Sequence, residues 1–203
     1  IYAFLLALLL NADVKGRSVF RTIFYLPSIV PAVANCMRWS WLYNKDFGLF
    51  NSILMAVGIP KQSFIAGQGS VIPSLIFMSM GGCGSTMIIY LAGLKSISGD
   101  IREAAVMDGA NAWQRFTRVT LPLLMPSIRI NVVTNIIGSL SVFDIIMALT
   151  EGGPGYSTES LSIYIMRMCY GSRTGYSTAV AMILFLIILL PVLISLRLTR
   201  EKE

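Results

Sequence analysis

Apolar residues gather in four long segments that polar linkers separate. The segments run over about 23–43, 71–94, 125–149 and 178–198, and each holds 21 to 25 residues. A helix needs about 20 apolar residues to cross a bilayer. A buried helix of a soluble protein is the alternative, but four such runs in 203 residues favour membrane spans. The pattern therefore predicts an all-α, polytopic transmembrane bundle.

A further apolar run, IYAFLLALLL, occupies residues 1–10. Ten residues are too few to cross a bilayer, and the basic residues follow this run, whereas they precede the apolar region of a signal peptide. We interpret the run as the second half of a membrane helix, in a chain truncated at its N-terminus. We expect residues 1–203 to form a single transmembrane domain.

Basic residues are distributed unequally between alternate linkers. One side of the alternating topology carries Lys45, Lys61, Arg167 and Arg173. The other side carries ten: Lys15, Arg17, Arg21, Lys95, Arg102, Arg115, Arg118, Arg197, Arg200 and Lys202. Loops rich in Lys and Arg remain in the cytoplasm. We therefore expect the linker that contains Lys95, Arg102, Arg115 and Arg118 to lie on the cytoplasmic side, together with the C-terminus.

Composition agrees with a membrane protein and excludes several chemistries. The chain is 55% hydrophobic and 13% charged, whereas soluble domains carry about 25% charged residues. Its net charge of +6 is explained by topology and anionic lipid, and no basic run with interleaved aromatics indicates nucleic acid. No histidine and no Walker A pattern occur. We expect no catalytic residue, metal or cofactor on this chain.

The polar island between the second and third complete spans predicts a helix, a tight turn and a second helix. Asp100 and Glu103 have the spacing of a capping box. Gly109 suits the left-handed conformation that ends such a helix. Asn111 and Gln114 repeat the cap spacing and begin the second helix.

This island resembles the EAA loop of the membrane subunits of bacterial ABC importers. Residues 103–122 read EAAVMDGANAWQRFTRVTLP. The resemblance implies that the EAA loop, here residues 98–122, lies in the cytoplasm and docks on an ATPase subunit. A hairpin resting on lipid headgroups is the alternative, but the small residues allow another protein to approach closely. The residues that the resemblance assigns to coupling are Glu103, Ala104, Ala105, Asp108, Gly109, Leu121 and Pro122.

Stretches outside the loop are similar to the carbohydrate branch of these permeases, which contains the maltose and glycerol-3-phosphate importers. They are Phe20-Arg21, Tyr25 to Pro27, Leu91 to Leu94, Asp108 to Ala110, Phe143-Asp144 and Leu149 to Pro154. Ile97-Ser98 departs from the branch, which usually has Ile-Pro.

The resemblance implies an ATP-driven subunit that moves a sugar inward across the bacterial plasma membrane. It also implies three kinds of partner: a homologous but different permease subunit, two cytoplasmic ATPases that hold ATP and Mg, and an extracellular solute-binding protein. A permease for a non-sugar solute, or an ion-driven secondary transporter, is the alternative. An ion-driven transporter predicts acidic residues in the middle of a span, and the one candidate, Asp144, lies near an outer end.

Polar side chains within the spans are candidates for a substrate path. Asn131, Asn135 and Ser139 recur every four residues on one helical face. Because polar groups facing lipid are costly, this face lines a path for sugar hydroxyls or packs against another helix. Both readings stay open. The further candidates near the outer ends of spans are Arg38, Trp39 and Asp144, although an aromatic belt also explains the tryptophan.

Glycine-rich and outer segments predict smaller features. Gly81, Gly82 and Gly84 indicate either a broken helix or close packing of two helices. Residues 49–57 predict a short helix that Gly58 ends. Residues 160–170 predict a short helix or strand at the outer surface.

Overall fold

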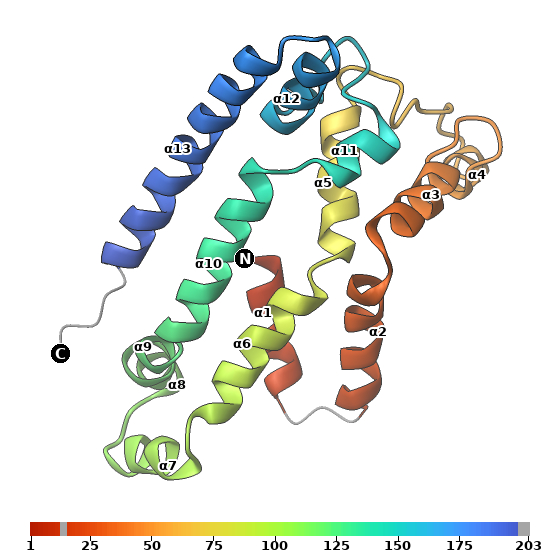
Figure 1. The fold of residues 1–203 in the computed structure, drawn as a ribbon. Helices are drawn as coiled ribbons and strands as arrows, with labels where there is room; N and C mark the ends of the chain where they lie inside the picture. The colour runs from red at the N-terminus through yellow and green to blue at the C-terminus, as the bar shows by residue number, and fades with distance from the viewer. Residues whose placement is uncertain (13–15, 199–203) are drawn as a thin grey trace. The chain divides into compact units, whose positions relative to one another are not determined.

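The computed structural model describes residues 1–12 and 16–198 (Figure 1). Helices joined by linkers make up these two ranges, and no strand occurs within them. The prediction of an all-α chain is confirmed. Of the basic residues used to predict topology, Lys15, Arg200 and Lys202 lie outside the described residues. Two compact units divide the chain, and each is described by itself.

The first unit comprises Ile1–Ser28, Gly82–Ile137 and the chain from Pro191. Its helices are α1 (Tyr2–Asn11), most of α2 (Arg17–Ile29), α6 (Gly84–Ser96) and most of α10 (Met125–Leu140). The EAA loop also belongs to it, as α7 (Gly99–Met107), α8 (Ala112–Arg115), the π-helix η1 (Phe116–Thr120) and α9 (Leu121–Leu123).

The core of the first unit lies between α1 and α6, which pack along each other. Ala3 and Ala7, one helical turn apart, are buried on α1, and their small side chains let the helices approach closely. Phe4 meets the ring of Tyr90 edge to face, with centroids 5.2 Å apart. This packing fixes the end of α6 from which the EAA loop emerges.

The second unit comprises Ile29–Gly81 and Gly138–Leu190. Its helices are α3 (Ala32–Leu42), α4 (Leu49–Ala56), α5 (Val71–Gly81), α11 (Asp144–Leu149), α12 (Leu161–Tyr170) and the first part of α13 (Thr174–Leu198). Its buried core contains Cys36, Trp39, Tyr43 and Met78, from α3, the residue after it and α5.

Three of the four predicted spans are interrupted. The break in the second agrees with the broken-helix reading of Gly81, Gly82 and Gly84, whereas a continuous helix over the first and the third is wrong. The first ends at Ile29 and resumes at Ala32, because Pro31 lacks an N–H and disfavours the helical conformation at the residue before it. The second is interrupted at Gly82-Cys83, and the third ends at Leu140. In the described ranges, Thr174–Arg197 is the one unbroken helix that is long and apolar enough to cross a membrane. The number of possible crossings rises to as many as four if each pair of helices joined at a sharp bend is counted as one span.

Gly84 shows that close packing accompanies the break in the second span. A Cβ at this position would lie 2.6 Å from the carbonyl oxygen of Phe24 and 2.8 Å from Cα of Tyr25. These are backbone atoms of α2, which cannot move away as a flexible side chain can. The backbones of α2 and α6 therefore meet where only glycine fits.

The two short elements predicted at residues 49–57 and 160–170 form as helices. α4 covers Leu49–Ala56, and Gly58 follows with φ +82°, as predicted. Residues 161–170 form α12, and Ser160 caps it by accepting a hydrogen bond from the N–H of Ile163 at 3.3 Å. The alternative of a strand at this segment is wrong.

Candidate functional site

The first helix of the EAA loop begins and ends at polar residues. Ser98, in extended conformation, is the N-cap of α7, and Asp100 lies in the first turn. The predicted cap at Asp100 is therefore wrong, because the helix already includes Gly99 and Asp100. At the other end Gly109 takes φ +74°, and its N–H bonds to the carbonyl of Val106 at 3.0 Å. This is the left-handed helix end that the sequence predicts.

The second helix of the loop begins with the predicted capping box. Asn111 Oδ1 accepts from the N–H of Gln114 at 2.8 Å, and Gln114 Oε1 accepts from the N–H of Asn111 at 2.9 Å. The helix then continues through the π-helical turn η1 into α9. Pro122 lacks an N–H, so the regular bond to the carbonyl of Arg118 cannot form there. The wider turn η1 lies immediately before this proline.

α7 has an anchored face and an outward face. On the anchored face Ala105 is buried, and Arg102 Nη2 donates to the carbonyl oxygen of Leu94, near the end of α6, at 2.6 Å. On the opposite face Glu103 is exposed, and Met107 is 88% exposed. The helix is thus fastened to α6 while it presents a carboxylate and a large apolar side chain outward.

The remaining coupling candidates lie along the same loop. Ala104 and Pro122 are exposed, and Leu121 is half-buried at the start of α9. Asp108 is the C-cap of α7 and is exposed. A Cβ added at Gly109 would meet nothing within 4 Å, so its positive φ, and not a lack of space within this chain, requires the glycine.

The polar stripe of α10 contains residues in two different environments. Asn131 is buried and its Nδ2 donates to the carbonyl oxygen of Thr86 on α6, at 3.2 Å. Asn135 is exposed in this chain and donates to the carbonyl of Asn131 at 2.7 Å. Ser139 is also exposed. Asn131 therefore joins two helices, whereas Asn135 and Ser139 remain accessible.

The candidates Arg38, Trp39 and Asp144 lie in the second unit. Trp39 is buried against aromatic rings, with centroid distances of 5.2 Å to Tyr43 and 5.8 Å to Phe77. Arg38 is exposed, and its Nη2 donates to Asn35 Oδ1 at 2.6 Å. Asp144 is exposed in the first turn of α11, which packs on α3. The structure thus places these three candidates on two packed helices.

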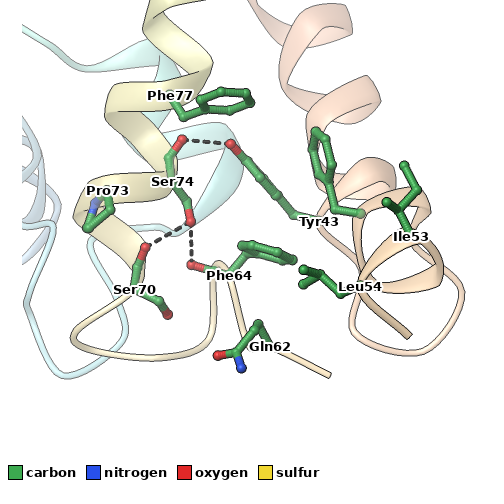
Figure 2. Close-up of a pocket in the computed structure, with 10 residues that line it drawn as sticks. Tyr43, Ile53, Leu54, Gln62, Phe64, Ser70, Pro73, Ser74 and Phe77 are labelled. Carbon is green, nitrogen blue, oxygen red and sulfur yellow. Dashed lines mark hydrogen bonds between the residues drawn. The ribbon is translucent and has the colours of Figure 1, made fainter. Parts of the chain in front are cut away.

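An apolar cavity of about 560 Å³ lies beside these aromatic residues (Figure 2). Its hydroxyl groups are already used within the chain. The Tyr43 hydroxyl donates to the carbonyl of Ser74 at 2.8 Å, and the Ser74 hydroxyl bonds the carbonyls of Ser70 and Phe64 at 2.8 and 3.1 Å. Aromatic rings such as Phe77 and aliphatic side chains such as Ile53 make up most of the remaining wall. The cavity therefore suits apolar atoms better than sugar hydroxyls.

Sequence reasoning missed this cavity. Its aromatic residues come from the residue after α3, from α4, from the linker after α4 and from α5, and they meet only because of the fold. A signal was present in the aromatic residues Tyr43, Phe50, Phe64 and Phe77, which lie in or near the linker between α3 and α5. No period in the sequence shows that their rings pack within about 6 Å of one another.

Arg167 makes several contacts with the linker before α12. Arg167 Nη1 forms an ion pair with Glu159 at 2.5 Å, and Nη2 donates to the carbonyl of Glu151 at 2.6 Å. Its guanidinium carbon lies 5.3 Å from the ring centre of Tyr156, a cation–π distance. The glycine-rich turn that starts this linker is thereby tied to α12.

The described chain thus combines broken apolar helices with an anchored helical hairpin. In the part of the chain that the structure describes, no group of His, Cys, Asp or Glu side chains could hold a metal ion. The chain belongs to the family of binding-protein-dependent transport system inner membrane components, whose sequence model matches residues 1–201.

Named relatives agree with this family. The trehalose/maltose transport system permease protein MalF of Thermococcus litoralis is 34% identical over 198 residues, which cover 97% of this chain and 67% of that protein. The multiple sugar-binding transport system permease protein MsmF of Streptococcus mutans is 33% identical, over 98% of this chain and 69% of that protein. The chain thus spans about two thirds of the length of these relatives.

Solved structures agree as well. The chain superposes on a bacterial ABC transporter involved in the import of the acidic polysaccharide alginate, with a TM-score of 0.88 and 30% identity. The match covers 98% of this chain and 71% of that one. The chain also superposes on a bacterial alginate ABC transporter in complex with an alginate pentasaccharide-bound periplasmic protein, with a TM-score of 0.87 and 30% identity. The resemblance to ABC permeases is therefore confirmed, and the chain is a transport subunit and not an enzyme.

Proposed function

We propose that this chain forms part of the membrane path of an ATP-driven importer for a sugar or sugar derivative, with the EAA loop as its coupling element. The two-faced helix α7 carries the proposal. Its outward face, with Glu103 and Met107, is free to meet an ATPase, while Arg102 and Ala105 fasten the helix to α6. The sugar-specific names of the relatives support the class of substrate.

Coupling then follows from rigid contacts. Two cytoplasmic ATPases hold ATP and Mg and supply the energy, and their closure displaces α7. Because Arg102 bonds α6 directly, a shift of α7 moves the end of α6 with it. The chain itself makes and breaks no covalent bond; its side chains bind, pack and move.

The importer contains further subunits. A homologous but different permease subunit completes the path, and an extracellular solute-binding protein delivers the sugar. The alginate importer in complex with its periplasmic protein supports the latter partner. The EAA loop and the C-terminus face the cytoplasm of a bacterial plasma membrane, which the excess of basic residues in these linkers supports.

Uptake by the reconstituted importer tests this function. The full-length chain, its partner permease, the ATPase and the binding protein are assembled in vesicles, and a panel of radiolabelled sugars is offered outside. We expect uptake of at least one sugar that requires both internal ATP and the binding protein. Uptake driven by an ion gradient without ATP would contradict the proposal, and ATP-driven uptake of a non-sugar solute alone would correct the substrate class.

A further inference from the structure

A polar cavity of about 260 Å³ lies within the first unit, on the anchored side of the EAA loop. Its wall comes from the end of α1, the end of α6, α7 and the second helix of the loop. The polar side chains in this wall are Asn11, Arg102, Arg115 and Thr120. Among the residues that the structure describes, none of those lining the cavity is acidic.

The two arginines give the described part of the cavity wall a positive charge. Arg102 uses one N–H for the carbonyl of Leu94 and keeps further donors on its guanidinium. Arg115, in the last turn of α8, is half-buried in the same wall. A guanidinium donates several N–H groups in a planar fork that suits phosphate. The cavity therefore has the chemistry of a site for a phosphate group.

The cavity lies where apolar helices end. α1 ends at Asn11 and α6 at Ser96, and polar residues follow both. Leu8 and Phe116 line the cavity beside the arginines. A cationic wall next to apolar side chains fits a lipid, because the phosphate meets the arginines while the glycerol and first acyl carbons meet the apolar residues.

We propose that this cavity binds the headgroup phosphate of an anionic membrane lipid and so fixes the EAA loop against α1 and α6. The inference rests on the cytoplasmic orientation given under the proposed function. An acidic side chain of the ATPase is the competing occupant. Arg102 and Ala105 lie on the anchored face of α7, opposite Met107, so the lipid is the better fit.

Native mass spectrometry of the full-length assembled importer tests this site directly. The complex is released from detergent containing phosphatidylglycerol or, in parallel, phosphatidylcholine, and the bound lipids are counted. The variants are Arg102→Gln, Arg115→Gln and their combination. Arg118→Gln is the matched control, because it removes one charge from an exposed side chain of the same loop that does not line the cavity.

We expect wild type and Arg118→Gln to retain phosphatidylglycerol in preference to phosphatidylcholine. Each cavity variant should weaken this retention about fivefold, and the combination should weaken it further. Arg102→Lys keeps the charge, so it should retain lipid better than Arg102→Gln. It also replaces Arg102→Gln in the experiment if the glutamine variant does not assemble. Inorganic phosphate added at millimolar concentration should not displace the lipid.

Three results would overturn the inference. Equal retention by the combined variant and wild type would show that the cavity binds no lipid. Equal loss in Arg118→Gln would reduce the effect to general surface charge, and displacement by inorganic phosphate would assign the site to the free ion. The same spectra also show whether the ATPase is bound. Absence of the ATPase from the wild-type complex would contradict the proposed function, whereas the three results above contradict only the lipid site. Loss of ATPase with retained lipid in the cavity variants would assign the arginines to the ATPase contact.

Discussion

Backbone conformation at single residues determines the shape of the EAA loop. Gly99 and Gly109 both have open space where a Cβ would lie, but Gly109 alone of the two has a positive φ, +74°. An L-residue in that conformation costs about 1–2 kcal/mol. The two positions therefore separate an effect of backbone angle from an effect of side-chain bulk.

Gly109→Ala is accordingly predicted to destabilise the turn by about 1–2 kcal/mol and to lower uptake, whereas Gly99→Ala should leave both unchanged. Gly109→Leu, which adds bulk where an ATPase would close around the turn, should abolish uptake while the membrane subunits still assemble. ATP-driven uptake and assembled complex are measured on the same vesicles. Equal effects of the two alanine substitutions would exclude the backbone angle as the cause.

The two asparagines of α10 are predicted to differ. Asn131→Ala removes the buried bond to Thr86 and should lower the stability of the complex by about 1 kcal/mol. Asn135→Ala should preserve assembly and the stimulation of the ATPase by the binding protein, yet reduce sugar uptake, because its exposed side chain is proposed to line the path. Loss of assembly in Asn135→Ala, with normal uptake for each assembled complex, would make the stripe a helix interface throughout.

At the scale of elements, the close approach of α2 and α6 limits which residues can occupy their contact. Gly84 meets backbone atoms of α2, whereas a Cβ at Gly138 on α10 would meet nothing within 4 Å. Gly84→Ala should therefore destabilise the assembled subunit by about 1–3 kcal/mol, and Gly138→Ala should have little effect. Thermal unfolding of the purified complex measures both. A neutral Gly84→Ala would mean that the two helices separate easily.

Local signals explain why the EAA loop could be predicted and why other parts could not. The capping box at Asn111 and the turn at Gly109 depend on residues within one helical turn, and the structure contains both. Pro31 is a local signal for a break that the sequence analysis did not use, because the length of its apolar segment indicates a single span. The contact between Asn131 and Thr86 joins residues on two separate helices, and no local period indicates that pairing.

The aromatic cavity and the arginine-lined cavity could not be predicted for the same reason. Each is assembled from several helices, and its lining depends on their packing. The outward face of α7 was only partly predicted. The sequence predicts the helix, whereas only the structure shows that Ala105 is buried, that Arg102 bonds the carbonyl of Leu94 and that Met107 is exposed.

At the scale of the whole molecule, the account requires the EAA loop and the outer linkers to lie on opposite sides of the membrane. Single cysteines at Ser98→Cys and Tyr170→Cys, in a chain without its native cysteines, test this arrangement. Tyr170 is 85% exposed at the end of α12. A membrane-impermeant thiol reagent applied to intact cells should label position 170 and leave position 98 unlabelled. The reverse pattern would place the loop outside, away from any ATPase.

Contact between the outward face of α7 and the ATPase is the central claim, and photocrosslinking measures it most directly. A photoreactive maleimide is attached to Met107→Cys, in a full-length chain without native cysteines, within the assembled importer; Tyr170→Cys serves as the control for an exposed outer position. We predict that irradiation crosslinks position 107 to the ATPase subunit. Position 170 should give no crosslink to the ATPase. Crosslinks from position 107 to lipid alone, in a complex that contains the ATPase, would contradict the account.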